Sequence, residues 1–94
     1  MPRPKCCRMI AEPPGCRSFG PAGMGGPVQP TVVLGLDEFE AIRLADLEGL
    51  YQEQAAEKLH VSRQTFGRII ESARKKVAQA LIEGRPLQIE GGPV

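Results

Sequence analysis

The sequence predicts a mainly α-helical fold, in which a three-helix core with a helix-turn-helix follows an irregular N-terminal arm. Two observations predict it. Glycine (11) and proline (9) are abundant in a chain of 94 residues, and they are concentrated before residue 31. After residue 36, apolar residues recur at three- and four-residue steps, which is typical of amphipathic helices. We therefore divide the chain into an arm, residues 1–30, and a helix-turn-helix domain, residues 31–94, since a chain of this length holds one core.

Composition and charge set limits on the class of protein. The chain is 41% hydrophobic and 24% charged, with a formal net charge of +1, as in ordinary soluble domains. An acidic segment, residues 31–60, lies between two basic ones, and such asymmetry favours a nucleic-acid partner. No stretch approaches the ~18 apolar residues of a membrane span, and no apolar secretory segment follows the charged start. We expect a cytoplasmic protein with no membrane partner.

The arm begins with a basic, proline-rich sequence, Pro2-Arg3-Pro4-Lys5. It resembles the short arms that enter a DNA minor groove, where Arg3 and Lys5 would meet a strongly negative potential. A frayed terminus that only aids solubility explains the same residues, because chain ends are often poorly ordered. Both interpretations stay open.

The three cysteines, Cys6, Cys7 and Cys16, lie in the same arm. An odd number without an export signal argues against a disulfide framework. Three roles remain: free thiols, ligands of a metal ion or iron–sulfur cluster with His60 or a second subunit completing the set, or a redox-sensitive pair. Adjacent cysteines lack the two-residue spacing typical of zinc sites.

The first predicted elements follow the arm. Residues 31–34 are short, β-branched and apolar, and they indicate a strand or an extended lead-in. Asp37 is then expected to cap a helix, whose acidic first turn suits the positive end of the helix dipole. An apolar stripe that includes Phe39 and Leu47 continues this helix until Gly49, which takes the position of a C-terminal glycine cap.

Two further helices are predicted. The second covers residues 52–59, with Ala55, Ala56 and Leu59 inside, and the third covers residues 63–82. Gly84 and Pro86 end the third helix, and the alternating residues 87–90 indicate a short strand. The buried face of the third helix is expected to consist of Phe66, Ile69, Ile70, Ala73, Val77 and Leu81.

The helix-turn-helix is predicted from Gln52 to about Ile70. Such a motif needs a small residue where the helices approach, an apolar anchor in the turn and a capped second helix. Ala56, Val61 and Ser62 supply these features in order. His60 takes a turn position that usually suits glycine because φ is often positive there, and histidine is among the residues that tolerate it.

Two resemblances follow from these motifs. LEGLYQEQAAE at residues 47–57 and VSRQTF at 61–66 resemble the DNA-reading motif of sigma-factor region four. The whole chain resembles a small prokaryotic family, the domain-of-unknown-function family one-three-four, through PRPK at 2–5, FGPAG at 19–23, DEFEAIRLAD at 37–46 and TFGRI at 65–69. The resemblance implies a transcription-factor-like DNA-binding protein and carries no substrate or effector.

The third helix carries the candidate site. Arg63, Gln64, Gly67, Arg68 and Glu71 face away from its apolar side. Arginine suits guanine and glutamine suits adenine in the major groove, each pair contributing roughly 1–3 kcal/mol of discrimination. We expect Arg63, Gln64 and Arg68 to read bases. Three further residues are expected to contact phosphate, namely Ser62, Thr65 and Arg74. A merely solvated helix face is the alternative.

The sequence thus predicts sequence-specific binding of double-stranded DNA and transcriptional regulation, by a homodimer built through the third helix or the strands at Val32 and Ile89. One alternative is an interaction module of the transcription machinery that uses an acidic first helix with Glu38 and Glu40. A second is a metal- or redox-responsive sensor that uses the cysteines. We expect no enzyme, since no catalytic motif is present and a single histidine limits acid–base chemistry.

Overall fold

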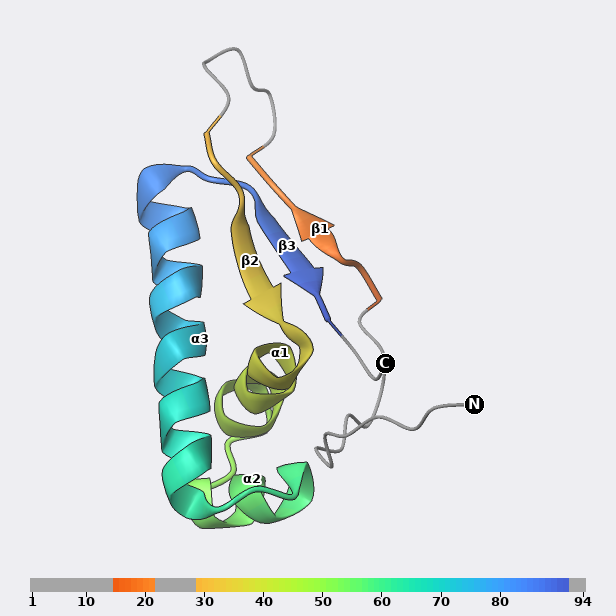
Figure 1. The fold of residues 1–94 in the computed structure, drawn as a ribbon, viewed down its shortest axis with the longest axis vertical. Coiled ribbons are helices and arrows are strands. Elements are labelled where there is room, and N and C mark those ends of the chain that lie inside the picture. The colour runs from red at the N-terminus through yellow and green to blue at the C-terminus, as the bar shows by residue number, and fades with distance from the viewer. Residues whose placement is uncertain (1–14, 22–28, 92–94) are drawn as a thin grey trace.

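The computed structural model describes residues 15–21 and 29–91. This part of the chain is mainly helical, with three helices beside a small three-stranded sheet (Figure 1). The mainly α fold class is confirmed. In chain order the elements are β1 (Ser18–Phe19), β2 (Val32–Gly35), α1 (Leu36–Ile42), the π-helical segment η1 (Arg43–Leu47), α2 (Gln52–Leu59), α3 (Arg63–Glu83) and β3 (Leu87–Glu90).

The sheet has the order β1-β3-β2, so β3 lies in the centre. β2 runs parallel to β3, with Val32 opposite Leu87, and β1 runs antiparallel to it. The strands β2 and β3 were predicted. The strand β1 lies in the segment predicted to be irregular, and pairing with β3 stabilises it, because Ile89 N–H donates to the Arg17 carbonyl at 2.8 Å.

The sheet and α3 enclose one of two apolar clusters. Leu34 and Ile89 of the sheet meet Leu36 and Ala73 of the helices there. Val32 and Ile89 are 5% and 2% exposed, so their side chains belong to the core of a single copy, and the dimer interface at their strands stays a prediction. They are buried because they lie on the sheet face that α3 covers.

The second cluster joins the three helices. Ala56, Leu59, Phe66 and Ile70 are almost fully buried in it, which confirms the predicted inner faces of α2 and α3. Two residues that were predicted to be buried are exposed instead: Leu47 is 78% exposed and Leu81 is 77% exposed. Leu47 ends the π-helical segment, where the α-helical repeat no longer holds, and Leu81 lies about 100° around α3 from the last buried residue.

The first helix begins at a different residue from the one predicted, and its last part is π-helical. Its N-cap is Gly35, and Asp37 lies inside the first turn, where its Oδ1 accepts from Glu38 N–H at 2.8 Å. The helix then widens, since Glu48 N–H donates to the Arg43 carbonyl at 2.9 Å, five residues back. Gly49 follows with φ +73°, as expected for the end of this helix. Across residues 15–21 and 29–91, no helix is both long and apolar enough to cross a membrane.

Candidate nucleic-acid interface

A three-residue turn joins α2 to α3. His60 has a left-handed backbone with φ 62°, as predicted, and its N–H donates to the Glu57 carbonyl at 3.2 Å. Val61 N–H donates to the Ala56 carbonyl at 3.0 Å, and the Val61 side chain packs against the helical core. The turn therefore reverses the chain at a fixed angle and joins two helices that share one core.

Ser62 caps α3. Its Oγ accepts from Thr65 N–H at 3.0 Å and donates to Thr65 Oγ1 at 2.9 Å, so the predicted cap is confirmed. Both hydroxyls, which the sequence assigned to phosphate contact, already hold the first turn of α3. The cap gives the following residue, Arg63, a defined position at the start of the helix.

The inner side of α3 fixes the direction of its outer side. Phe66 is fully buried and Ile70 is 2% exposed, so α3 cannot rotate without leaving the core. Because the helix repeats every 3.6 residues, Arg63, Gln64 and Arg68 then lie on the solvent side, and all three are exposed. The structure thus brings together the three predicted base-reading residues.

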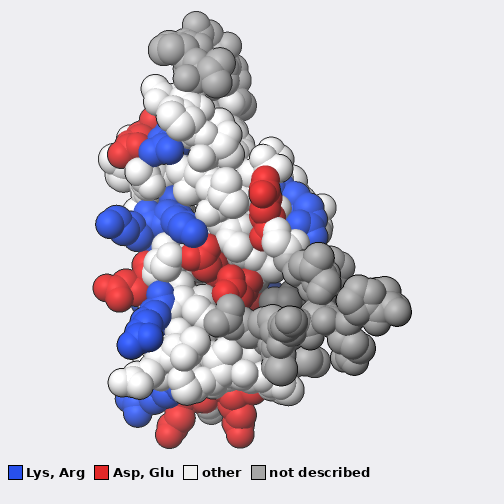
Figure 2. Space-filling model, viewed as in Figure 1, with Lys and Arg blue, Asp and Glu red and all other residues white. Residues whose placement is uncertain are grey.

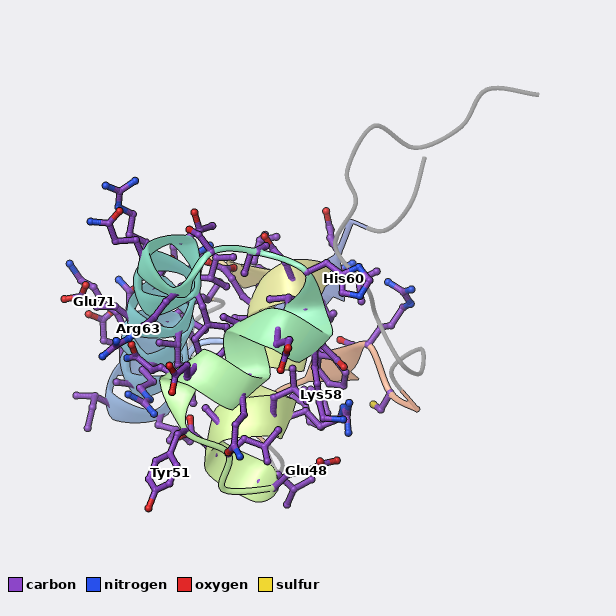
Figure 3. All side chains as sticks on the ribbon, turned by 90° about the horizontal axis from the view of Figure 1, so that it is seen from below. Glu48, Tyr51, Lys58, His60, Arg63 and Glu71 are labelled. Atoms are coloured by element: carbon purple, nitrogen blue, oxygen red, sulfur yellow. The ribbon has the colours of Figure 1, made fainter. Side chains whose placement is uncertain are left out.

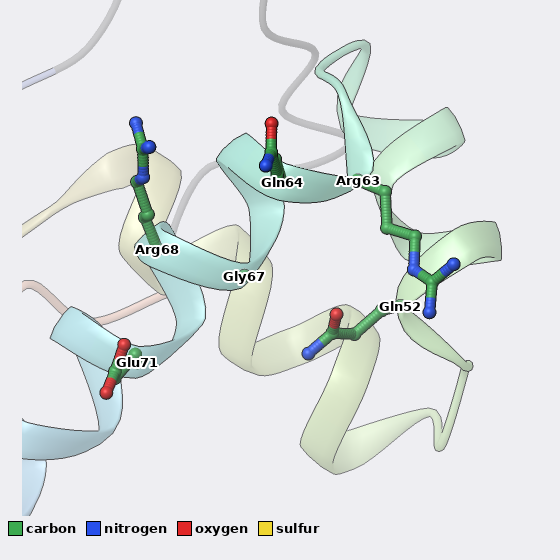
Figure 4. A pocket seen from close by; sticks show the side chains of 6 residues that line it. All are labelled: Gln52, Arg63, Gln64, Gly67, Arg68 and Glu71. Carbon is green, nitrogen blue, oxygen red and sulfur yellow. The ribbon is translucent and has the colours of Figure 1, made fainter.

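These residues border a shallow groove between α2 and α3. Its volume is about 550 Å³ (Figure 4). Gly67 lies in the middle, Gln64 and Arg68 project on one side of it, and Gln52 reaches in from α2 on the other. The lining side chains offer guanidinium, amide and carboxylate groups: Gln52, Arg63, Gln64, Arg68 and Glu71.

Gln52 and Glu71 were not among the predicted site residues. Gln52 comes from a different helix, and its place beside Gly67 depends on how α2 crosses α3. The position of Gln52 at the start of α2 was the only sequence signal for it. Glu71 carried a clearer signal, because it lies one helical turn after Gly67 on the same outward face.

The cations along α3 differ in their partners. Within the described residues, Arg63 and Arg68 form no ion pair. Arg74, a predicted phosphate contact, is held by Asp46 of η1 through Nε at 3.2 Å and Nη2 at 2.6 Å. The hydrogen bond to Asp46 raises the pKa of Arg74. Along the left edge of the molecule, where α3 lies, Figure 2 shows basic side chains (blue) interspersed with acidic ones (red), so the basic surface is discontinuous.

The two glutamates of α1 are buried. Glu38 is 8% exposed and Glu40 is 2% exposed. Glu40 Oε2 accepts from Arg43 Nη2 at 2.6 Å, and Arg43 also pairs with Glu48; the hydrogen bond to Glu40 is the main cause of the raised pKa of Arg43. The prediction that Glu38 and Glu40 form an exposed interaction face is therefore wrong, because both carboxylates have partners inside the fold.

The predicted metal and arm residues are mostly beyond what the structure describes. Arg3, Lys5, Cys6 and Cys7 lie outside the described residues. Cys16 is exposed, and its Sγ donates to the Ser18 carbonyl at 3.2 Å. Among residues 15–21 and 29–91, no three His, Cys, Asp or Glu side chains gather as metal ligands would. Figure 3 places His60 on the opposite side of the molecule from Arg63 and Glu71.

Fold and groove together define a small, mainly helical domain that presents a polar helix face beside a short turn. The chain belongs to the family described as "Protein of unknown function DUF134", which matches residues 1–94. The resemblance to that family is confirmed.

Its relatives carry the name UPF0251 protein. One from Syntrophobacter fumaroxidans is 64% identical over 92 residues, which cover 98% of this chain and 59% of that protein. One from Chlorobaculum tepidum is 53% identical over 94 residues, covering 100% of this chain and 48% of that protein. One from Thermoanaerobacter pseudethanolicus is 51% identical, covering 98% and 78%. This chain therefore spans about half to three fifths of the length of the first two. No solved structure matches it.

Proposed function

We propose that this protein binds double-stranded DNA sequence-specifically and regulates transcription, with α2 and α3 acting as a helix-turn-helix similar to that of sigma-factor region four. The observation that carries the proposal is the two-sided character of α3. Its inner side is fixed by Phe66, while Arg63, Gln64 and Arg68 are exposed around a groove at its N-terminal end.

The dimensions and chemistry of α3 suit the major groove. A helix with its side chains is about 10–12 Å wide and the B-DNA groove is about 12 Å wide. Arg63 and Arg68 offer paired donors to guanine, and Gln64 can pair with adenine. Ser62 and Thr65 lie at the same helix end, where the dipole favours phosphate, and Arg74 would reach phosphate by exchanging Asp46 for it.

A homodimer is part of the proposal. One short helix reads few base pairs, and paired half-sites about 34–36 Å apart are the usual solution. The far end of α3 offers an apolar surface for a second copy, since Leu81 and Ile82 are 77% and 84% exposed.

The test is selection of bound duplexes from sheared genomic DNA, followed by titration of the best duplex at several salt concentrations. Wild type should enrich one motif, and Arg63→Ala/Gln64→Ala should bind it about tenfold or more weakly, because each lost base contact contributes roughly 1–3 kcal/mol. Affinity should fall steeply with salt.

A matched control removes the same chemical groups elsewhere. Lys58→Ala/Gln79→Ala also deletes one cation and one amide, but neither residue borders the groove. It should bind the selected duplex like wild type. If wild type and Arg63→Ala/Gln64→Ala bind every fragment equally weakly, the protein is not a sequence-specific reader.

A further inference from the structure

Gly67 has no internal reason to be glycine. It lies in the fifth position of the 21-residue helix α3, where glycine is the least favourable residue after proline. Its φ is not in the left-handed region, and a Cβ built on it would meet only Gln52 Oε1, at an ordinary contact distance of 3.8 Å. Neither the backbone nor the packing of the described residues therefore requires a residue without a side chain at position 67.

The space left by the missing side chain of Gly67 opens into the groove between α2 and α3. Gly67 is its floor, Gln52 borders it from α2, and Glu71 borders it from the next turn of α3 (Figure 4). Glu71 lies four residues further along the helix, about 6 Å away along its axis. An absent side chain at the centre of an exposed polar groove leaves room for atoms from outside the protein.

Glu71 restricts what those atoms can be. It is exposed and forms no ion pair with any described residue. An ionised carboxylate only accepts hydrogen bonds and repels phosphate. In the major groove the only base donors are the exocyclic amino groups of cytosine N4 and adenine N6, and Glu and Asp side chains pair with cytosine N4.

We infer that the groove at Gly67 is a subsite for a base-pair edge. The missing side chain lets the edge approach the backbone of α3, and Glu71 accepts a hydrogen bond from cytosine N4 at that pair or the next. This inference rests on the proposed function, since it assigns to Gly67 and Glu71 a part of the specificity of the same helix.

The experiment separates folding from binding. Gly67→Ala and Gly67→Met both favour the helix, and the Cβ has room, so both variants should melt at or above the wild-type temperature. Both should nevertheless bind the wild-type-selected duplex more weakly, Gly67→Met by about tenfold or more, while binding to an unrelated duplex at low salt stays unchanged. Gln79→Ala, on the same helix outside the groove, serves as the control.

Glu71→Ala tests the assigned base. Repeating the duplex selection with this variant should relax a cytosine preference at one position and leave the rest of the motif in place. An unchanged motif would overturn the role of Glu71. Gly67 variants that bind the selected duplex like wild type, or that weaken selected and unrelated duplexes equally, would overturn the base-edge subsite.

The failure of this inference can be distinguished from the failure of the proposed function. If wild type selects a motif that Arg63→Ala/Gln64→Ala loses, while the Gly67 variants keep it, only the subsite is wrong. If wild type selects no motif, the DNA-reading function is wrong and the subsite falls with it.

Discussion

One buried carboxylate links the start of α1 to the middle of α3. Glu38 accepts from Gly35 N–H at 2.8 Å, from Ser72 Oγ at 2.6 Å and from Lys76 Nζ at 2.9 Å. Burial by itself raises the pKa of Glu38, but the hydrogen bonds from Ser72, Gly35 and Lys76 together outweigh it, so the net pKa is lowered. The ionised form is therefore the one that stabilises the fold.

The stability of the protein should consequently depend on Glu38 and on pH. A lowered pKa means that the contribution is fully present above the unfolded value of about 4.5 and is lost as pH falls through the folded value. At pH 7, Glu38→Gln should lower the free energy of unfolding by about 1–3 kcal/mol, as expected for hydrogen bonds to a charged group. Urea unfolding at pH 7 and at pH 3 measures this, and the difference from wild type should shrink at pH 3. A constant difference, or an equal loss in the exposed control Glu53→Gln, would contradict it.

Most residues that act on their own neighbours were predictable, with the cap expected at Asp37 as the exception, whereas residues with distant partners were not. Ser62, His60 and Gly49 were assigned correctly, because a cap or a positive φ is a local property of one turn. Glu38 was assigned to an exposed face, because its partners Ser72 and Lys76 lie on another helix. Nothing in its immediate sequence shows those partners.

At the scale of elements, β3 connects the sheet to the helices. It is the central strand, and Ile89 packs against Leu34 of β2 and Ala73 of α3 in the same cluster. Val33 of β2 lies on the other face of the sheet and is 45% exposed. The two faces therefore differ in what they contribute to stability.

Shortening side chains on the two faces should show this difference. Ile89→Ala should lower the free energy of unfolding by about 2–4 kcal/mol, because it removes buried methyl groups and leaves a cavity. Val33→Ala, the matched control, should cost less than about 1 kcal/mol. Equilibrium urea unfolding followed by circular dichroism measures both. Similar losses in the two variants would mean that β3 does not anchor α3.

The elements with a periodic pattern were predicted, and those set by partners were not. Apolar spacing gave α2 and α3 and also predicted the outward face with Arg63 and Gln64. It could not give β1, whose two residues become a strand only through β3, nor the π-helical hydrogen bonds of η1. Gln52 joins the groove from a second helix, and a pattern along one helix carries no information about it.

At the scale of the molecule, α3 separates two surfaces of different character. The described residues place the sheet toward one end of the molecule and the turn between α2 and α3 at the other (Figure 1). The polar groove lies near the start of α3. Leu81 and Ile82 lie near its end, so a second copy could dock there without covering the groove.

A charge introduced at the end of α3 should therefore prevent self-association. Under the proposed homodimer, wild type should sediment as a dimer and Leu81→Glu/Ile82→Glu as a monomer at the same concentration, because burying an unpaired carboxylate is strongly unfavourable. Leu47→Glu is the control, since Leu47 is similarly exposed but lies at the end of η1. Sedimentation equilibrium tests this, with circular dichroism to verify folding. A monomeric wild type, or equal dissociation in the control, would refute this interface.

Because β3 is the central strand and also the last one in the chain, the sheet cannot form until the end of this segment has been translated. β1 and β2 pair with β3 and not with one another, and Arg17 meets Ile89 across 72 positions of the chain. A ribosome makes both outer strands before it makes their shared partner. A nascent chain paused before Leu87 therefore carries two unpaired strand edges, which other chains can bind. Among the described residues, the last strand to be synthesised is thus the one whose pairing removes these exposed edges.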